Sequence, residues 1–419
     1  MLKNILILGL GGQGYCAAKY LGSKNIGKKI YCLDLDAKVL NKLENDYKNF
    51  ICQRLDCSKE EKIIAYAKNK KIDLLINCLP TNLTKICLEV ALKSKCNYQD
   101  FAIGDGMKNG GTWVDEAKLY VEHYSDLFKK NNKLALIGTG VAPGLMCILT
   151  RLAARKLDTI HTIYNFFYEG VDTKTFIPFW FNPDTALTDM IDDPVVFSNG
   201  KFIFPEPFSN PTYRKYEYFS HEIAFVEHRH EEAIIYGINA KKYYPGLKRA
   251  HFKYAGTNID FCKQLYRAGL LTKTPIKYNN TSIIPVNFVR TKTTPPPKLE
   301  QDIKKIISHG FNSDEVFSFV EVYGVKNNKK YISEFHIFAP GLKKAFELKK
   351  LSSEQFLTGQ SGAIFSEMMI KEEIKNNGCI FSDELSLEEI NVYMNKIKKC
   401  GIKFMERLTS TNNINPENI

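Results

Sequence analysis

The fold of this chain is decided by Lys3-Asn-Ile-Leu-Ile-Leu-Gly9-Leu-Gly11-Gly12-Gln13-Gly14. The apolar run before Gly9 predicts a buried strand, and the glycines have the G-x-G-x-x-G spacing that opens the helix of a dinucleotide site. In such a turn the first glycine permits the tight bend, the second lets the main chain approach a pyrophosphate, and the third brings helix and strand together. The alternative is a Gly-rich turn without a ligand. We predict cofactor contacts from Gly9, Gly11, Gly12, Gln13 and Gly14.

An acidic residue follows the second strand at the place where such sites hold a ribose. The run Lys29–Leu33 ends in Asp34, which lies 20 residues beyond Gly14. A carboxylate there accepts hydrogen bonds from the ribose diol and repels a 2′-phosphate. Lys38, close in sequence, softens this repulsion. We therefore predict NAD as the cofactor and keep NADP as the alternative.

Composition excludes several classes of protein. The chain has 419 residues, of which 44% are hydrophobic, and no apolar run approaches the roughly 18 residues of a membrane helix. The N-terminus enters the first strand directly, which leaves no room for a signal peptide. Eleven cysteines are scattered without a C-x-x-C pair. This pattern is typical of a cytoplasmic protein with free thiols.

The net charge of +12 comes from lysines spread along the whole chain. A nucleic-acid-binding protein usually concentrates its basic residues on one face. We expect neither a nucleic-acid partner nor a membrane partner, and instead a small-molecule substrate such as an amino acid or amine. A positive field also attracts an anionic cofactor.

Strand and helix patterns alternate through the first 150 residues and predict a parallel sheet. Ligands bind at the carboxyl ends of parallel strands, so residues that follow each strand are candidates for cofactor contact. Besides the Gly-rich turn and Asp34, these are Asp56, Cys57, Cys78, Leu79, Pro80 and Gly140.

The rest of the chain has a different pattern. Short, aromatic β-type runs between Thr159 and Val289 predict an antiparallel sheet with a few helices. Helical patterns cover Gln355–Lys375 and Ser386–Cys400, and we expect the last third of the chain to be helical. We predict an α/β protein with a dinucleotide-binding domain at 1–150, an inserted α+β substrate or dimerisation domain at 151–350, further helices at 351–405, and a polar, frayed tail at 406–419.

The chain resembles the saccharopine dehydrogenase family in the broad sense that includes lysine 6-dehydrogenases and carboxynorspermidine dehydrogenases. Four motifs besides the Gly-rich turn carry this resemblance: Asn77-Cys-Leu-Pro80, Ile137-Gly-Thr-Gly140-Val-Ala-Pro143-Gly144, Phe181-Asn182-Pro183 and Leu357-Thr358-Gly359. The resemblance implies a Rossmann domain interrupted by a substrate domain, with the final helices returning to the Rossmann domain. It further implies hydride transfer between NAD(P) and the carbon of a C–N bond in an amino acid or its secondary-amine adduct. We also expect a homodimer.

Two subfamilies share features with the chain. The segment Val141–Gly144 resembles the lysine 6-dehydrogenase turn, whereas Phe181-Asn182-Pro183 and His230-Glu231-Glu232 resemble carboxynorspermidine dehydrogenase. That second family normally has Asp-Thr-Ala where this chain has Asp100-Phe101-Ala102, and it uses NADPH. The substrate therefore stays open between these types.

Hydride transfer at a C–N bond also needs a group that manages one proton on nitrogen. The catalytic candidates are Asp100, His230 and Glu231, with a structural turn as the alternative for each. We expect substrate contacts from Phe101, Pro143, Trp180 and Asn182, although the aromatic residues also suit a core. We predict no metal, since His228 and His230 lack an evident third ligand. The rival to an enzyme is a non-catalytic NAD-binding sensor.

Overall fold

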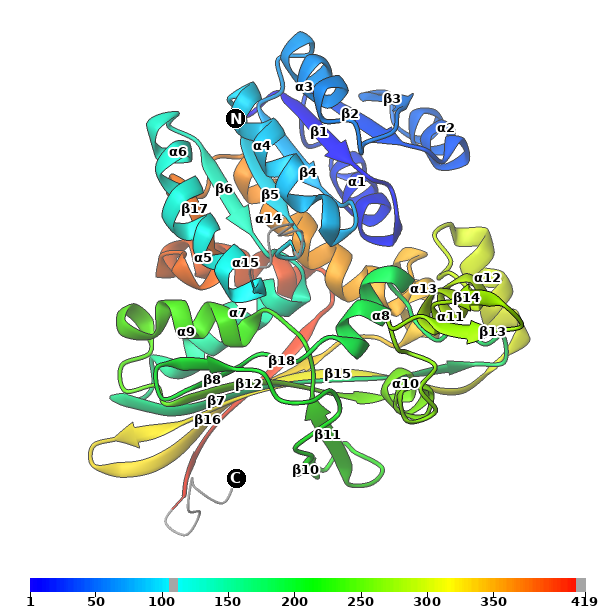
Figure 1. The fold of residues 1–419 in the computed structure, drawn as a ribbon. Coiled ribbons are helices and arrows are strands. Elements are labelled where there is room, and N and C mark those ends of the chain that lie inside the picture. The colour runs from blue at the N-terminus through cyan, green and yellow to red at the C-terminus, as the bar shows by residue number, and fades with distance from the viewer. Residues whose placement is uncertain (105–111, 412–419) are drawn as a thin grey trace. The chain divides into compact units, whose positions relative to one another are not determined.

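The computed structural model describes residues 1–104 and 112–411, which form two compact units (Figure 1). The first unit comprises Met1–Ile148 and Glu354–Ile402. The second comprises Leu149–Ser353 and the strand Lys403–Ser410. Each unit is thus built from two separate segments of the chain. Among the described helices, none combines the length and the apolar character that a membrane span requires.

The first unit contains a parallel sheet with the strand order β17-β6-β5-β4-β1-β2-β3 (Figure 1). The strand order reverses at β1, and ligands bind at such a reversal, beyond the carboxyl ends of the strands. The strands are β1 (Asn4–Leu8), β2 (Lys29–Asp34), β3 (Phe50–Arg54), β4 (Leu74–Asn77), β5 (Asn97–Asp100), β6 (Leu134–Ile137) and β17 (Gly378–Phe381). The predicted Rossmann-type parallel sheet is confirmed.

Helices connect these strands because a parallel pair needs a crossover. Side chains start several of them: Asp36 accepts the Lys38 N–H at the start of α2, and Ser386 and Glu389 form a capping box on α15. The helical elements are α1 (Gly12–Ser23), α2 (Ala37–Asp46), α3 (Glu60–Asn69), η1 (Thr81–Leu83), α4 (Thr84–Ser94), α5 (Trp113–Leu119), η2 (Tyr120–Tyr124), α6 (Ser125–Lys130), η3 (Val141–Leu145), η4 (Gln355–Gly359), α14 (Gln360–Ile370), η5 (Ser382–Glu384) and α15 (Leu387–Lys399).

Two segments near the end of the chain form strands, one in the part predicted as helical and one largely in the predicted polar tail. Gly378–Phe381 forms strand β17, which pairs in parallel with β6 at the edge of the first sheet. Its four residues are all buried. A buried run of this length has no periodicity that separates a strand from a helix.

The second segment lies largely in the predicted polar tail. Lys403–Ser410 forms strand β18, which pairs antiparallel with β16 at the edge of the second sheet. Most of its side chains are exposed, and a charged edge strand has the composition of a tail. The rest of the predicted tail, 412–419, lies outside the described residues.

The second unit is organised on a nine-stranded sheet with the main order β10-β11-β12-β7-β15-β16-β18. The prediction of an antiparallel sheet holds for most pairs, but β7 and β12 run parallel, so the sheet is mixed. The chain between them contains α8 and α9, which allows the crossover. The strands are β7 (Thr159–Thr173), β8 (Val196–Ser198), β9 (Lys201–Ile203), β10 (Thr212–Arg214), β11 (Ile223–Glu227), β12 (Arg249–Gly256), β15 (Phe311–Lys326), β16 (Lys329–Phe338) and β18.

Aromatic side chains form the core on one face of this sheet. Phe166 and Phe319 stack with ring centroids 4.6 Å apart, and Phe225 meets both rings edge-on. The remaining elements are a small hairpin, β13 (Ile276–Tyr278) and β14 (Thr281–Ile283), and the helices α8 (Pro183–Ile191), α9 (Glu232–Tyr243), α10 (Thr257–Arg267), α11 (Pro285–Lys292), α12 (Glu300–His309) and α13 (Leu342–Lys349). Helix α7 (Met146–Ala154) crosses the boundary between the two units.

Candidate functional site

The three glycines of the N-terminal turn have three different surroundings. Gly9 has a φ of +83°, and a Cβ there would lie 2.9 Å from the carbonyl oxygen of Cys78. A Cβ on Gly14 would lie 2.0 Å from the carbonyl oxygen of Gly9, so α1 packs directly on the turn. A Cβ on Gly11 would meet nothing within 4 Å. The open space is therefore at the glycine that must approach a pyrophosphate.

Helix α1 begins at this turn and offers its first N–H groups. Its N-cap, Gly11, makes no side-chain cap, and the first turn contains no acidic residue. Uncapped N–H groups and the positive end of the helix dipole suit a phosphate. Gln13 extends from the same turn and donates from Nε2 to Glu354 Oε1 at 3.1 Å. The chain thus presents a cradle that fits the pyrophosphate of a dinucleotide.

Asp34 is held at the carboxyl end of β2. Its Oδ2 accepts the Leu10 N–H at 2.5 Å and its Oδ1 accepts the Asp36 N–H at 2.7 Å. These bonds tie the carboxylate to the Gly-rich turn, and each oxygen keeps a second lone pair for a ribose hydroxyl. Arg54 on β3 is the register partner of Asp34, and it brings a basic residue to the same edge.

The predicted cofactor residues that follow β3 and β4 differ in burial and in their contacts. Asp56 is exposed and accepts the Ser58 N–H, which lowers its pKa. Cys57 is buried, and burial, with Asp34 and Asp56, raises the pKa of its thiol to about 12, so it is a packing residue. Cys78 donates its N–H to the carbonyl of Leu8 at 2.8 Å. Leu79 and Pro80 continue this turn, and a Cβ on Gly9 would meet the Leu79 side chain at 2.9 Å.

Asp100 joins two strands of the first sheet. It is 1% exposed, and its Oδ1 accepts the Gly138 N–H at 2.6 Å. Its carbonyl oxygen accepts the Thr139 hydroxyl at 2.6 Å. Phe101 is also buried, and its carbonyl oxygen accepts the Gly140 N–H at 3.2 Å. The Asp100 carboxylate therefore orients the turn after β6, which contains the predicted residues Gly140 and Pro143.

Residues of the second segment of this unit, Glu354–Ile402, also hydrogen-bond to that turn. Ser361 donates its hydroxyl to the carbonyl of Gly140 at 2.9 Å, and Ser382 donates to the carbonyl of Gly144 at 2.8 Å. Gln99 donates from Nε2 to the carbonyl of Gly362 at 2.8 Å. Sequence reasoning missed these residues. The Leu357-Thr358-Gly359 motif was the only signal that this part of the chain takes part.

In the second unit, His230 is clamped by two carboxylates where β11 leads into α9. Its Nδ1 lies 2.9 Å from Glu231 Oε2 and 2.6 Å from Glu232 Oε2. The two glutamates are 3% and 0% exposed, so the surface-turn alternative for this segment is wrong. No described residue hydrogen-bonds to Nε2 of His230, whose side chain is 21% exposed. The ring thus has one clamped nitrogen and one that a substrate can reach.

The two histidines of this segment have opposite pKa shifts. Burial alone lowers the pKa of His230, but Glu232 and Glu231 outweigh it and hold the pKa well above its ordinary value. Burial, followed by the charges of His230 and Arg229, holds the pKa of His228 well below its ordinary value. The two glutamates thus favour the protonated form of His230, and burial favours the neutral form of His228. Such a divergence is typical of acid–base sites.

Aromatic and polar residues of β12, α10 and β7 continue this surface. His230 stacks on Phe252 with ring centroids 4.2 Å apart, and His228 lies 4.9 Å from the Tyr254 ring. Glu169 Oε2 accepts the Tyr254 hydroxyl at 2.8 Å and the Asn258 amide at 2.9 Å. No sequence motif pointed to Glu169, Tyr254 or Asn258, because the pairing of β7 with β12 brings Glu169 to the other two, which are four residues apart at the junction of β12 and α10.

The other two predicted residues of this unit differ: no described residue hydrogen-bonds to Nε1 of the buried Trp180, whereas Asn182 caps a helix. Trp180 is 3% exposed. Asn182 caps α8, since its Oδ1 accepts the N–H groups of Asp184 and Thr185 at 2.9 and 3.0 Å, and Pro183 takes the first helical position. Arg229 reaches Asp189 of α8 at 3.3 Å, which links this helix to the histidine segment.

The clamp is also the one group among the described residues whose ligand atoms suit a metal ion. The ligand atoms of His230, Glu231 and Glu232 lie within 4.8 Å of one another. This group does not include His228, so the structure does not bring together the two histidines that the sequence suggested as ligands. That the protein holds no metal stays a prediction.

Comparisons with known proteins match the nucleotide-binding part of the first unit and the fold of the chain. Residues 5–135 match the family described as saccharopine dehydrogenase NADP binding domain. Carboxynorspermidine synthase from Vibrio alginolyticus is 22% identical over 211 residues, which are 47% of this chain and 51% of that protein. The match therefore spans about half the length of that relative.

A solved structure extends the likeness to the whole chain. The fold of saccharopine dehydrogenase (L-Glu forming) from Saccharomyces cerevisiae matches with a TM-score of 0.65 at 13% identity, over 97% of this chain and 100% of that one. At this identity the match concerns the fold. A nicotinamide cofactor, which the cradle at Gly11 fits, follows from the match of residues 5–135 to the saccharopine dehydrogenase NADP binding domain. Residues 5–135 are thus a nicotinamide-nucleotide-binding domain of the saccharopine dehydrogenase type, and the chain has the fold of a saccharopine dehydrogenase.

Proposed function

We propose that this protein is an NAD-linked dehydrogenase that transfers a hydride at the C–N bond of an amino acid or of a secondary amine formed from one. The observation that carries the proposal is the buried clamp on His230, with Nδ1 against Glu231 and Glu232 and Nε2 left for a substrate. A protein that only senses NAD has no need for such a proton-transfer group.

The nicotinamide supplies or accepts the hydride, and the chain manages the proton. In the reductive direction, the imidazolium of His230 gives its Nε2 proton to the substrate nitrogen as the C=N bond becomes a C–N bond. In the oxidative direction the neutral ring takes that proton back, because the same group serves both directions. Glu231 and Glu232 stabilise the charged ring in each case.

Strands β4, β5 and β6 lie side by side in the first sheet, and Pro80, Asp100 and Gly140 follow their carboxyl ends. We propose that the turn containing Gly140 and Pro143 meets the nicotinamide and that Asp100 positions this turn through Gly138. Phe101, Trp180 and Asn182 remain proposed substrate contacts.

The substrate class follows from the clamp and from the relative. Buried carboxylates favour a cationic amine, and the curated relative is named for carboxynorspermidine. We therefore place a carboxynorspermidine-type secondary amine first, followed by saccharopine and lysine. We further propose a cytoplasmic homodimer, and the eleven free cysteines support a reducing compartment.

The test is an activity screen with NAD and NADP against carboxynorspermidine, saccharopine and lysine. On the substrate that turns over, His230→Ala and Glu231→Gln should lower kcat by about 10²-fold or more, the usual scale of acid–base groups, with NADH affinity unchanged. His221→Ala is the matched control, since this exposed histidine hydrogen-bonds, among the described residues, to Ser220 alone. Full turnover in both clamp variants would remove His230 from the mechanism. Failure on every C–N substrate would return the chain to the sensor hypothesis.

A further inference from the structure

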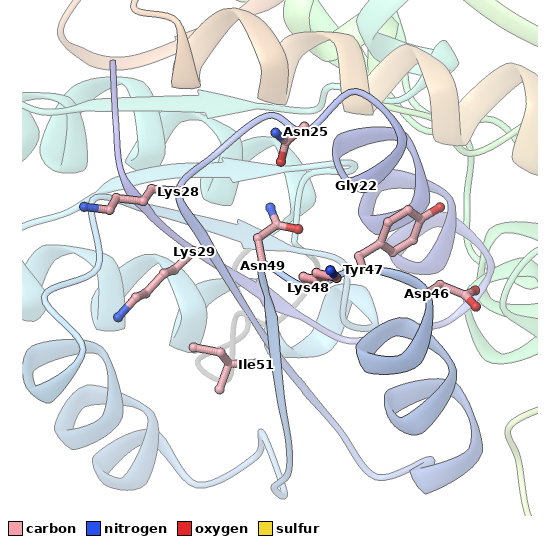
Figure 2. A pocket seen from close by; sticks show the side chains of 9 residues that line it. All are labelled: Gly22, Asn25, Lys28, Lys29, Asp46, Tyr47, Lys48, Asn49 and Ile51. Carbon is pink, nitrogen blue, oxygen red and sulfur yellow. The ribbon is translucent and has the colours of Figure 1, made fainter.

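A second hollow lies in the nucleotide-binding unit, at the opposite end of β2 from the ribose carboxylate. Its volume is about 450 Å³. Strand β2 begins at Lys29, which lines the hollow, and ends at Asp34, roughly 17 Å away along the strand. The lining residues are Gly22, Asn25, Lys28, Lys29, Asp46, Tyr47, Lys48, Asn49 and Ile51 (Figure 2).

The hollow has a surplus of positive charge. Lys28, Lys29 and Lys48 are exposed, and no described acidic residue forms an ion pair with any of them. Asp46, the acidic residue of the lining, is already paired with Lys42 at 3.0 Å. Three ammonium groups are thus left for a ligand, and Figure 2 shows Lys28 and Lys29 on one side and Asp46 on the other.

The lining of the hollow also includes one aromatic and one aliphatic side chain, those of Tyr47 and Ile51. The Tyr47 ring lies so close to Gly22 that a Cβ there would be 2.8 Å from the ring. The ring also lies 5.2 Å from that of Phe50, which fixes its orientation. Ile51, another residue of the lining, is 37% exposed, although large aliphatic side chains are usually buried.

The end of helix α1 at this hollow does not oppose an anion strongly. The carbonyl of Gly22 accepts the Asn25 N–H at 3.0 Å, and the carbonyl of Leu21 accepts the Ile26 N–H at 2.9 Å. Carbonyls that are bonded in this way expose little of the negative end of the helix dipole.

We propose that this hollow binds a phosphorylated small molecule with a flat ring system, of the size of a nucleoside monophosphate. The phosphate meets Lys28, Lys29 and Lys48, and the ring lies on Tyr47 and Ile51. A volume of this size is within the range of small-molecule sites. The site is separate from the Gly-rich turn and does not depend on the proposed reaction.

The experiment is calorimetric titration of the full-length protein with AMP in the presence of saturating NADH, which occupies the Gly-rich turn. We expect one AMP site per chain. The double variant Lys28→Glu/Lys48→Glu should weaken AMP at least tenfold without changing NADH affinity. Lys68→Glu, which reverses the charge of one exposed lysine of the same unit outside the hollow, is the control and should leave AMP binding within twofold.

A second measurement tests the contact between the ring of the ligand and Tyr47, and it needs no substitution in the protein. The dissociation constant of inorganic phosphate, measured by its competition with AMP, should be at least tenfold higher than that of AMP. The proposal is overturned if no AMP binds beside NADH, or if Lys68→Glu weakens AMP as much as the double variant does. It is also overturned if inorganic phosphate binds as tightly as AMP, because the ring would then make no contact.

Discussion

Glu367 of α14 is the buried carboxylate that ties three helices of the nucleotide-binding unit together. It accepts the Tyr20 hydroxyl of α1 at 2.7 Å and pairs with Lys396 of α15 at 2.6 Å and with Lys371 at 2.7 Å. Its side chain is 4% exposed. Burial alone would raise the pKa of Glu367, but the hydrogen bonds from its lysine and tyrosine partners outweigh it and lower the pKa.

We predict that Glu367→Gln lowers the free energy of unfolding by about 2 kcal/mol at neutral pH, because the lysines lose a shared partner. A carboxyl with a lowered pKa contributes its stability above the unfolded pKa of about 4.3 and loses it as the pH falls. The difference from the unmodified protein should therefore shrink below about pH 4. Urea unfolding at several pH values measures it. Glu388→Gln, on the exposed side of α15, should change stability by less than about 0.5 kcal/mol.

We propose that Asp34 sets the preference between the two nicotinamide cofactors. The Leu10 and Asp36 N–H groups hold its carboxylate at the end of β2, beside the Gly-rich turn. We predict that NADH binds more tightly than NADPH and that Asp34→Ala narrows the difference at least tenfold, as calorimetry would show. A clear NADPH preference in the unmodified protein would contradict the assignment of Asp34 to the ribose and would favour Arg54 as a phosphate ligand.

The junction of β1 with α1 provides a matched pair of glycine substitutions. Gly11→Ala places its Cβ in open space at a φ of −61°, which alanine adopts without strain. Gly14→Ala drives its Cβ to 2.0 Å from the Gly9 carbonyl oxygen. We predict that Gly11→Ala unfolds at the same temperature but weakens NADH at least tenfold, because the methyl group occupies the pyrophosphate position.

Gly14→Ala should instead lower the free energy of unfolding by about 2 kcal/mol or more, as overpacked sites do. Thermal melts and NADH titrations of both variants separate the two effects. If Gly11→Ala kept full affinity, the open space at that glycine would not be the pyrophosphate site.

The two-segment construction of each unit has a consequence for the complete molecule. Strand β18 is the part of the second unit that the chain reaches only after it has completed the first. We predict that a chain ending at Ile402 binds NADH within about twofold of normal. It should lose about 5 °C or more in the melting of the second unit, because β16 loses its neighbour.

A chain ending at Thr411 keeps β18 and is the control. Differential scanning calorimetry with and without NADH distinguishes the two units, since the ligand raises only the transition of the unit that binds it. Loss of NADH binding in the chain ending at Ile402 would contradict the independence of the first unit.

The sequence by itself determined the nucleotide-binding turn and the parallel sheet around it. One strand–helix–strand unit contains Gly9, Gly11, Gly14 and Asp34. In such a unit the spacing of residues along the chain fixes where they lie relative to one another. The turns after β4, β5 and β6 could be assigned to one edge for the same reason, because parallel strands end together.

Only the tertiary structure decided how distant segments complete these features. Ser361 and Ser382 reach Gly140 and Gly144 across more than two hundred residues, and β17 and β18 join sheets that began far earlier in the chain. The clamp on His230 depends on packing that buries Glu231 and Glu232 against the ring, and these two glutamates raise the pKa of His230 against the effect of burial. Short polar or apolar segments carry no periodicity of their own, so their structure comes from the partners that tertiary packing supplies.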